Sequence, residues 1–238
     1  MEKYGRWREI WEKKGQSCKK KDINLIDLLY LDGFDRIGKF NEDTWMRLVD
    51  SISKELNLSP GKSLLEIGCG SGAMLLPLSQ RNIKVAGIDY SASLINIAKL
   101  VIPDMIAIVS EADKLPFRDN KFDFVMSNSV FQYFSNKNYA KNVLNEMVRV
   151  VSKNEGKLLI LDVPDISKEG LSEDFRKNIM NKSTYKKLYN GLYHTYYPKD
   201  WFKSYALEEG LKFKIFDQSI EGYDNSPYRF NVLFEVCR

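Results

Sequence analysis

A glycine-rich turn, Gly68-Cys69-Gly70-Ser71-Gly72, comes directly after the short apolar run Ser63–Ile67. Glycine costs backbone entropy, so three glycines within five residues need a compensating cause. In a chain of alternating strands and helices, the usual cause is a βα turn whose main chain lies close to a ligand. The turn therefore favours an open parallel sheet with a ligand at the carboxyl end of an early strand.

Strand-like and helical segments alternate along most of the chain. The apolar runs typical of buried strands cover 63–68, 84–89, 105–110, 122–127 and 156–163. Helical patterns between them cover 72–81, 91–101 and 138–152. This alternation predicts an α/β fold, a parallel sheet with helices on both faces. A helix over 198–210, with Pro198 in its first turn and Gly210 after its end, then precedes two strands, 211–218 and 228–238, whose short separation suits an antiparallel hairpin.

The length of 238 residues suits one large domain, which we divide into four parts. Residues 1–60 form an N-terminal helical cap, in which the helix over 42–58 carries one apolar face. Residues 61–163 form the ligand-binding core. Residues 164–200 are polar and tyrosine-rich and form an inserted lid on the acceptor side. Residues 201–238 supply the closing helix and strands.

Charge and cysteine usage narrow the class of protein. The net charge is +4, and the lysines between Lys13 and Lys21 are best interpreted as a solvated surface, not a nucleic-acid interface. The three cysteines are far apart, with neither a disulfide framework nor zinc spacing. No apolar run is long enough to span a bilayer, so a cytoplasmic protein without membrane insertion is expected. The mildly basic balance is compatible with an anionic small substrate.

Two acids define the expected ligand. Asp89 ends the second strand about twenty residues after the turn, where a carboxylate accepts hydrogen bonds from ribose hydroxyls. Glu66 stands just before the turn, where it would oppose the pyrophosphate of a dinucleotide. It would instead suit a cation, such as the α-amino group of a methionine moiety. The pair therefore favours S-adenosylmethionine over a nicotinamide cofactor.

From about 61 to 164, the sequence resembles the class I (Rossmann-like) S-adenosylmethionine-dependent methyltransferases, particularly the small-molecule type. The shared motifs are LLEIGCGSG, VAGIDYS, EADKLPF and FDFVMSNSVFQYF. The resemblance implies a doubly wound seven-stranded sheet of order 3-2-1-4-5-7-6 with an antiparallel last strand, and S-adenosylmethionine as cofactor with S-adenosylhomocysteine as product. It implies a cofactor site formed by Glu66, Gly68, Gly70, Gly72, Asp89, Tyr90, Glu111, Ala112, Asn128 and Ser129. Glu111 replaces the aspartate usual in the family, and Gln132 and Tyr133 are expected near the reaction centre.

Catalytic groups are harder to assign than cofactor groups. His194 is the only histidine and lies among tyrosines in the predicted lid, so it is a candidate general base for a hydroxyl, or else a structural residue. Tyr133 is the second candidate catalytic residue. Ser127 takes the place of the strand-four carboxylate of metal-dependent enzymes, so no metal is expected. Asn128-Ser129-Val130 contains no proline, unlike the motif of nucleic-acid amino methylases, so no nucleic-acid partner is expected.

The leading hypothesis is O-methylation of a small-molecule acceptor that could carry a negative charge, in natural-product or surface-saccharide biosynthesis. An N-methyltransferase of a small amine is a close alternative. A non-catalytic protein that binds S-adenosylmethionine is the second class, and a nicotinamide enzyme on the same sheet is the third, because fold alone does not separate them. The acceptor and the oligomeric state are not fixed by the sequence.

Overall fold

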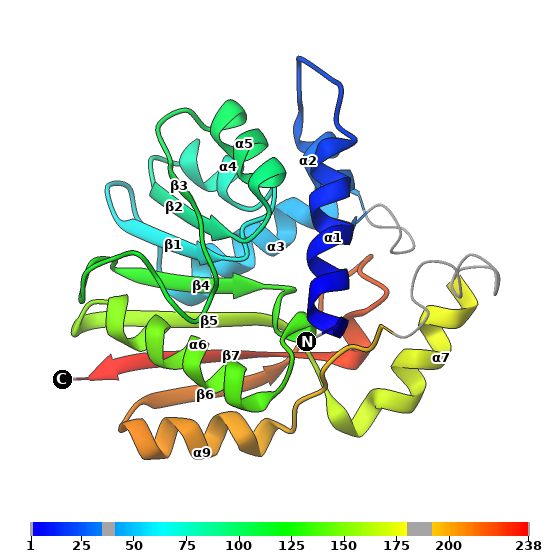
Figure 1. Ribbon diagram of the computed structural model, residues 1–238. Helices are drawn as coiled ribbons and strands as arrows, with labels where there is room; N and C mark the ends of the chain where they lie inside the picture. Colours follow the sequence, from blue (N-terminus) through cyan, green and yellow to red (C-terminus); the bar gives the residue numbers. More distant parts are fainter. Residues whose placement is uncertain (1, 35–40, 180–191, 238) are drawn as a thin grey trace.

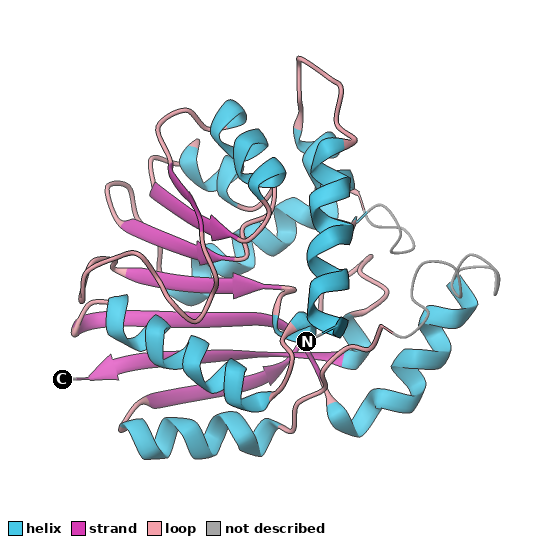
Figure 2. Ribbon diagram, viewed as in Figure 1, coloured by secondary structure: helices cyan, strands magenta, loops and turns pink. Residues whose placement is uncertain are grey.

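The computed structural model describes residues 2–34, 41–179 and 192–237. Helices and strands alternate through the central part of the chain, as the sequence predicts (Figure 2). The helices are α1 (Glu2–Gln16), α2 (Leu25–Leu31), α3 (Glu42–Leu56), α4 (Leu75–Ser79), α5 (Ala92–Val101), α6 (Lys137–Val150), α7 (Glu169–Ile179) and α9 (Lys199–Glu209). The strands are β1 (Ser63–Ile67), β2 (Lys84–Asp89), β3 (Ile106–Val109), β4 (Phe124–Asn128), β5 (Asn154–Pro164), β6 (Lys212–Asp217) and β7 (Arg229–Cys237).

The seven strands form one sheet in the order β3-β2-β1-β4-β5-β7-β6. The first five strands are parallel, and β7 lies antiparallel between β5 and β6. The predicted order and the antiparallel last strand are therefore confirmed. Strand order reverses at β1, where Glu66 pairs with Gly87 of β2 on one side and Met126 of β4 on the other. Ligands of open α/β sheets bind at such a switch point, beyond the carboxyl ends of the strands.

Each face of the sheet has its own apolar core. Helices α3, α4 and α5 pack on one face, against alternate side chains such as Leu64, Met126 and Leu159. Helices α6 and α9 pack on the other, against Leu65 and Val125, their neighbours along the same strands. Because successive strand residues point to opposite faces, strands buried on both sides must be apolar throughout. This explains why the strand runs in the sequence are continuous and not alternating.

Helices α1 and α2 lie beyond the carboxyl ends of the parallel strands, where the arrowheads of β1, β2 and β4 point in Figure 1. Asn41 starts α3, since its side-chain oxygen accepts a hydrogen bond from Thr44 N at 2.9 Å. The predicted apolar face of α3 is confirmed, because the apolar residues at helical spacing along it are buried: Trp45, Leu48, Val49, Ile52 and Leu56.

Side-chain hydrogen bonds join these N-terminal helices to the glycine-rich turn and to Ala73, which follows it. Trp45 Nε1 of α3 donates to the carbonyl of Ala73 at 3.0 Å, in a fully buried contact. Ser71 Oγ donates to the carbonyl of Leu28 in α2 at 3.2 Å. The N-terminal segment therefore forms part of the same packed unit as the sheet, although the four-part division of the domain stays a prediction.

Two local details differ from the sequence interpretation. The helix that follows the glycine-rich turn, α4, is shorter than predicted, because only Leu75–Ser79 of the predicted 72–81 are α-helical. Pro198 is the N-cap of α9 in extended conformation, not a residue of its first turn, whereas Gly210 ends the helix with φ 66° as predicted.

Among the helices that the structure describes, none is long and apolar enough to cross a membrane.

Trp45→Phe tests how strongly the cap is bound to the turn. Loss of the buried hydrogen bond and part of the ring should lower the free energy of unfolding by about 1–3 kcal/mol in urea denaturation. Trp201→Phe is the matched control, because it removes the same atoms from a half-buried indole in α9. Equal losses in the two variants would show that the contact with Ala73 adds nothing specific.

Candidate active site

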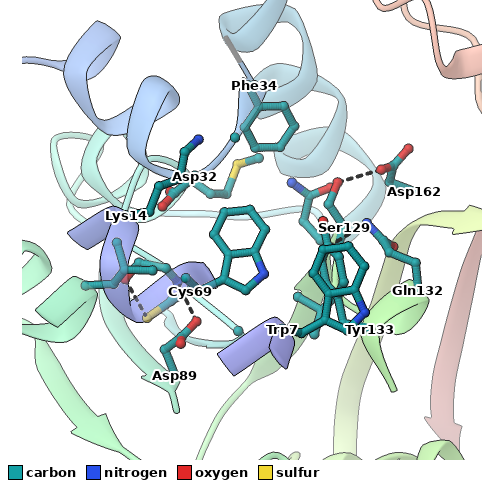
Figure 3. A pocket seen from close by; sticks show the side chains of 18 of the residues that line it. Trp7, Lys14, Asp32, Phe34, Cys69, Asp89, Ser129, Gln132, Tyr133 and Asp162 are labelled. Carbon is teal, nitrogen blue, oxygen red and sulfur yellow. Dashed lines mark hydrogen bonds between the residues drawn. The ribbon is translucent and has the colours of Figure 1, made fainter. Parts of the chain in front are cut away.

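A cavity of about 530 Å³ opens at the carboxyl ends of β1, β2 and β4, and its lining is drawn in part in Figure 3. One wall is a single face of α1, at the helical spacing of Trp7, Ile10, Trp11 and Lys14. The glycine-rich turn forms the base of the cavity, and the segment around His194 forms its far end. The cavity therefore combines the N-terminal cap, the core and the predicted lid.

The glycines of the turn are required by both conformation and space. Gly68 and Gly70 have φ values of 73° and 53°, which side chains rarely adopt. A Cβ on Gly68 would lie 2.4 Å from Val130 Cγ2, and one on Gly70 would lie 2.4 Å from Asp32 Oδ1. Gly72, with φ 90°, faces Ala98 of α5 and Ile102, the residue that follows this helix, and does not line the cavity.

Three carboxyl groups gather at the turn. Asp89 is buried and accepts hydrogen bonds from Gly70 N at 3.0 Å and Ser91 N at 2.8 Å. Asp32, at the end of α2, accepts from Ser71 N at 2.8 Å and Ala73 N at 3.4 Å. Glu66 is 3% exposed, and its Oε2 is buried without a hydrogen-bond partner. The base of the cavity is therefore acidic.

Burial is the main cause of the raised pKa values in this acidic cluster. It raises the pKa of Asp32 to about 7, against the opposing hydrogen bonds from Ser71. It raises the pKa of Asp89 to about 6 in the same way, and that of Glu66 well above its ordinary value, with Asp32 and Asp89 adding to the shift. A cation at this position would relieve the repulsion, whereas a phosphate would increase it.

Cys69 lies between two of the glycines and is 3% exposed. Burial, followed by the nearby carboxyls, raises the pKa of its thiol well above the ordinary value. A thiol that stays protonated is a poor nucleophile. This favours the interpretation of Cys69 as a residue chosen for its size, next to Gly87 of β2, where a Cβ would lie 2.5 Å from the Cys69 sulfur.

Helix α1 closes the cavity beside the ends of β2 and β3. Arg8 pairs with Glu111 at 2.6 Å, lies 5.6 Å over the ring of Tyr90 and donates to the Tyr90 carbonyl at 3.3 Å. Tyr90 and Ala112 line the cavity, whereas Glu111 is turned into the ion pair and does not. The glutamate that replaces the usual aspartate therefore contacts the cap.

At the opposite end, three rings pack around one another. The ring of His194 lies 5.6 Å from that of Trp7 and 5.4 Å from that of Tyr133, which meets it edge-on. Both nitrogens of His194 are buried without a hydrogen-bond partner. Burial, and then the charges of Arg176 and Arg229, lower the pKa of His194 well below 6.5, so its ring is neutral at pH 7.

Polar groups from β4 and β5 line the middle of the cavity. Ser129 has φ 56°, and its hydroxyl donates to Asp162 Oδ2 at 2.6 Å, a bond drawn in Figure 3. Gln132 donates to the Ser129 carbonyl at 2.8 Å, while its own Oε1 is buried without a partner. Asn128, at the end of β4, is 7% exposed and also lines the cavity. An unpartnered acceptor thus faces the region between the two ends.

The structure brings ten of the twelve predicted site residues to one cavity. They are Glu66, Gly68, Gly70, Asp89, Tyr90, Ala112, Asn128, Ser129, Tyr133 and His194. It does not bring Gly72 and Glu111 to the lining. Within the described residues, no group of three or more His, Cys, Asp or Glu side chains is arranged to hold a metal ion.

Sequence reasoning misjudged some of the lining residues. For Arg176, the sequence favours a solvated helix face over a contact with an anionic group; the solvated face is wrong, because Arg176 is 8% exposed and lines the cavity. Trp7 and Arg229 were missed, and Asp32 was noted only as part of the cap. A tryptophan pair at i, i+4 was the available signal for Trp7 and Trp11. Lys186, Lys187, Asp35 and Arg36, also considered, lie outside the described residues.

Known proteins share both the core of this chain and its fold. A family described as "Methyltransferase domain" matches residues 65–160. A demethylmenaquinone methyltransferase of Thermotoga maritima is 34% identical over 153 residues, which cover 63% of this chain and 64% of the relative. A probable tRNA methyltransferase 9B of Homo sapiens is 34% identical over 107 residues, 45% of this chain and 22% of the relative. The matches therefore span less than two thirds of these relatives.

A solved S-adenosylmethionine-dependent methyltransferase from Aquifex aeolicus has the same fold. The TM-score is 0.57 at 20% sequence identity, over 90% of this chain and 100% of that chain. The matched methyltransferase domain and the observed strand order are consistent with each other. The glycine-rich turn lies at the point where the strand order of that sheet reverses. Residues 65–160 thus match a methyltransferase domain, and the described chain has the fold of a solved S-adenosylmethionine-dependent methyltransferase.

Proposed function

We propose that the protein transfers a methyl group from S-adenosylmethionine to a hydroxyl of a small-molecule acceptor. The choice of cofactor rests on Glu66. Its Oε2 is buried without a hydrogen-bond partner, close to the carboxyl groups of Asp32 and Asp89. Such a cluster needs a cationic ligand. S-adenosylmethionine carries an ammonium and a sulfonium group, whereas a nicotinamide dinucleotide would bring its pyrophosphate to these carboxyls.

The lining residues fit the parts of this cofactor one by one. Glu66 and Asp32 suit the ammonium group, and Asp89 suits the ribose hydroxyls because each of its oxygens retains a free lone pair beside one amide contact. Lys14, whose ammonium donates to the Tyr30 carbonyl at 2.5 Å, suits the methionine carboxylate. Tyr90 and Ala112 suit the adenine ring, and Asn128 and Ser129 suit the region of the methionine chain.

Bound S-adenosylmethionine supplies an activated methyl group, so the chain itself must orient the acceptor and accept one proton. The unpartnered nitrogens of His194 support its role as the proton acceptor. Its lowered pKa keeps the ring in the neutral, basic form at pH 7. Tyr133 meets the ring edge-on at 5.4 Å and supports its orientation. A single base of this kind favours a hydroxyl acceptor, which must lose a proton to become a strong nucleophile.

The aromatic walls of Trp7, Tyr133 and His194 favour a small acceptor over a nucleic acid. Because one relative is named as a probable tRNA methyltransferase, a nucleic-acid acceptor is an alternative that must be tested. An N-methyltransferase of an amine would use the same base, and a non-catalytic cofactor-binding protein would need only the acidic end. A broad acceptor panel that includes hydroxyl and amine compounds of matched shape and a tRNA separates these functions.

Asp89→Ala tests the cofactor assignment. In calorimetry, the wild type should bind S-adenosylmethionine and S-adenosylhomocysteine and not NADH, and the variant should lose about tenfold or more in affinity because a ribose contact to a charged group is removed. Asp104→Ala, which removes an exposed acid with no such contact, should bind as the wild type does. Binding of NADH instead would overturn the assignment.

The acidic cluster also predicts a pH dependence of binding. Because the pKa values of Asp32 and Asp89 are raised to about 7 and about 6, both carboxyls change from largely protonated to largely ionised as the pH rises from 5 to 8. The ionised forms attract the ammonium group, so S-adenosylhomocysteine affinity should increase about tenfold or more over this interval. Asp32→Asn should weaken binding at pH 7 and flatten the profile, and Asp104→Asn should change neither. A flat wild-type profile would contradict this picture.

His194→Gln tests the base. With an acceptor found in the panel, kcat should fall about 100-fold or more, while S-adenosylhomocysteine affinity stays the same. In the wild type, kcat should not decline until the pH is below 6.5, because the pKa of His194 is depressed. The control is Tyr193→Phe, which alters an exposed neighbour. Unchanged turnover in His194→Gln would remove the histidine from the mechanism.

A further inference from the structure

Two buried arginines, Arg176 and Arg229, line the end of the cavity that holds His194, and they indicate the kind of acceptor. We propose that Arg229 and Arg176 form an anion-binding subsite that holds a carboxylate or phosphate group of the methyl acceptor beside the ring of His194. The inference rests on the proposed function for the identity of this ligand as the acceptor, although the subsite itself is a feature of the cavity. Both guanidinium groups line the same cavity as the cofactor residues.

Arg229 starts β7 and is 2% exposed. Its Nε and Nη1 atoms are buried without hydrogen-bond partners, although a guanidinium normally satisfies its donors when it is removed from water. Asp162 Oδ1 lies 3.7 Å from Nε, so the two side chains form a buried ion pair at a distance too long for a hydrogen bond. The guanidinium group of Arg229 therefore lies at the cavity, and two of its nitrogens have no hydrogen-bond partner.

Asp162 does not neutralise Arg229 through hydrogen bonds because its oxygens are already engaged. Oδ2 accepts from the hydroxyls of Ser129 at 2.6 Å and Tyr223 at 2.9 Å. Oδ1 accepts from Gln218 Nε2 at 3.0 Å. A carboxylate that only braced the arginine would accept from Nε or Nη1. The observed arrangement instead engages Asp162 with neutral donors, while Arg229, which lines the cavity, keeps Nε and Nη1 without hydrogen-bond partners.

Arg176 brings a second guanidinium from a different element. It lies on α7, is 8% exposed, and donates to Glu173 Oε1 at 2.8 Å. Glu173 also accepts from the hydroxyl of Tyr196 at 2.9 Å, so its charge is shared. Helix α7 is fixed against the segment before β7 by the rings of Phe175 and Tyr228, 5.4 Å apart. This packing directs two cations from separate parts of the chain to one place.

The rings next to the arginines define the rest of the ligand. The ring centroids of Trp7, Tyr133 and His194 lie 4.8 to 5.6 Å from one another, so a flat group bound beside the anion would meet this aromatic cluster. The fork geometry of guanidinium matches two oxygens of a carboxylate or phosphate. The acceptor class is therefore a planar, ring-bearing molecule with an anionic oxygen group and a hydroxyl to be methylated.

Three matched probes test the subsite: benzoate, phenyl phosphate and the neutral benzamide. Their binding is measured by calorimetry or ligand NMR, with and without saturating S-adenosylhomocysteine, in the wild type and in Arg229→Met and Arg176→Met. Arg81→Met, which removes an exposed arginine paired with Asp50, is the control. Circular dichroism and thermal melting of each variant establish whether it is folded, and Arg176→Met carries the test should Arg229→Met not fold.

At least one anionic probe should bind the wild type about tenfold or more tightly than benzamide, and this preference should be lost in the folded arginine variants and kept in Arg81→Met. The more strongly bound anion identifies the source as carboxylate or phosphate. Equal binding of benzamide, no anion binding, or a preference that survives both substitutions overturns the subsite. Anion preference without any S-adenosylhomocysteine affinity would overturn the proposed function and leave the subsite in place.

Discussion

The carboxylate of Asp32 accepts hydrogen bonds from the amide groups of the glycine-rich turn, and most of the site depends on this contact. The turn can admit a carboxylate only because Gly70 has no Cβ, which would lie 2.4 Å from Asp32 Oδ1. Ser71 and Trp45 add further bonds between the turn and the cap. The same absence of side chains that opens the turn to a ligand therefore also fixes the N-terminal helices over it.

The two ends of the cavity have opposite electrostatic character. Carboxyl groups with raised pKa values surround the glycine-rich turn, and buried arginines stand at the far end. Charges in a low-dielectric interior interact strongly, so they are tolerated only where a ligand or a fixed partner compensates them. Aromatic rings, chiefly Trp7 and Tyr133, lie near the histidine of the basic end. Under the proposed function, this polarity would hold the cationic cofactor at the acidic end and an anionic acceptor at the end that carries the arginines.

The order of elements and the acids of the cofactor site could be predicted because they depend on local patterns. Strands, glycines and Asp89 follow one another at fixed spacing, and the family resemblance supplied the strand order. The cap contact could not be predicted in this way, since Asp32 and Ser71 are 39 residues apart. The burial pattern of α7 could not be predicted either. Leu171 is 67% exposed, whereas Arg176 is buried, and this is the reverse of what their polarity indicates.

Helix α1 contacts both ends of the cavity through consecutive residues. Trp7 packs against the ring of His194, and Arg8 pairs with Glu111 beside the expected adenine position. A helix moves as a rigid rod over such a short distance, so neither contact can be released without disturbing the other. A displacement of α1 would therefore break the Arg8–Glu111 pair and the Trp7–His194 contact together, so access to the two ends of the cavity is coupled through one helix.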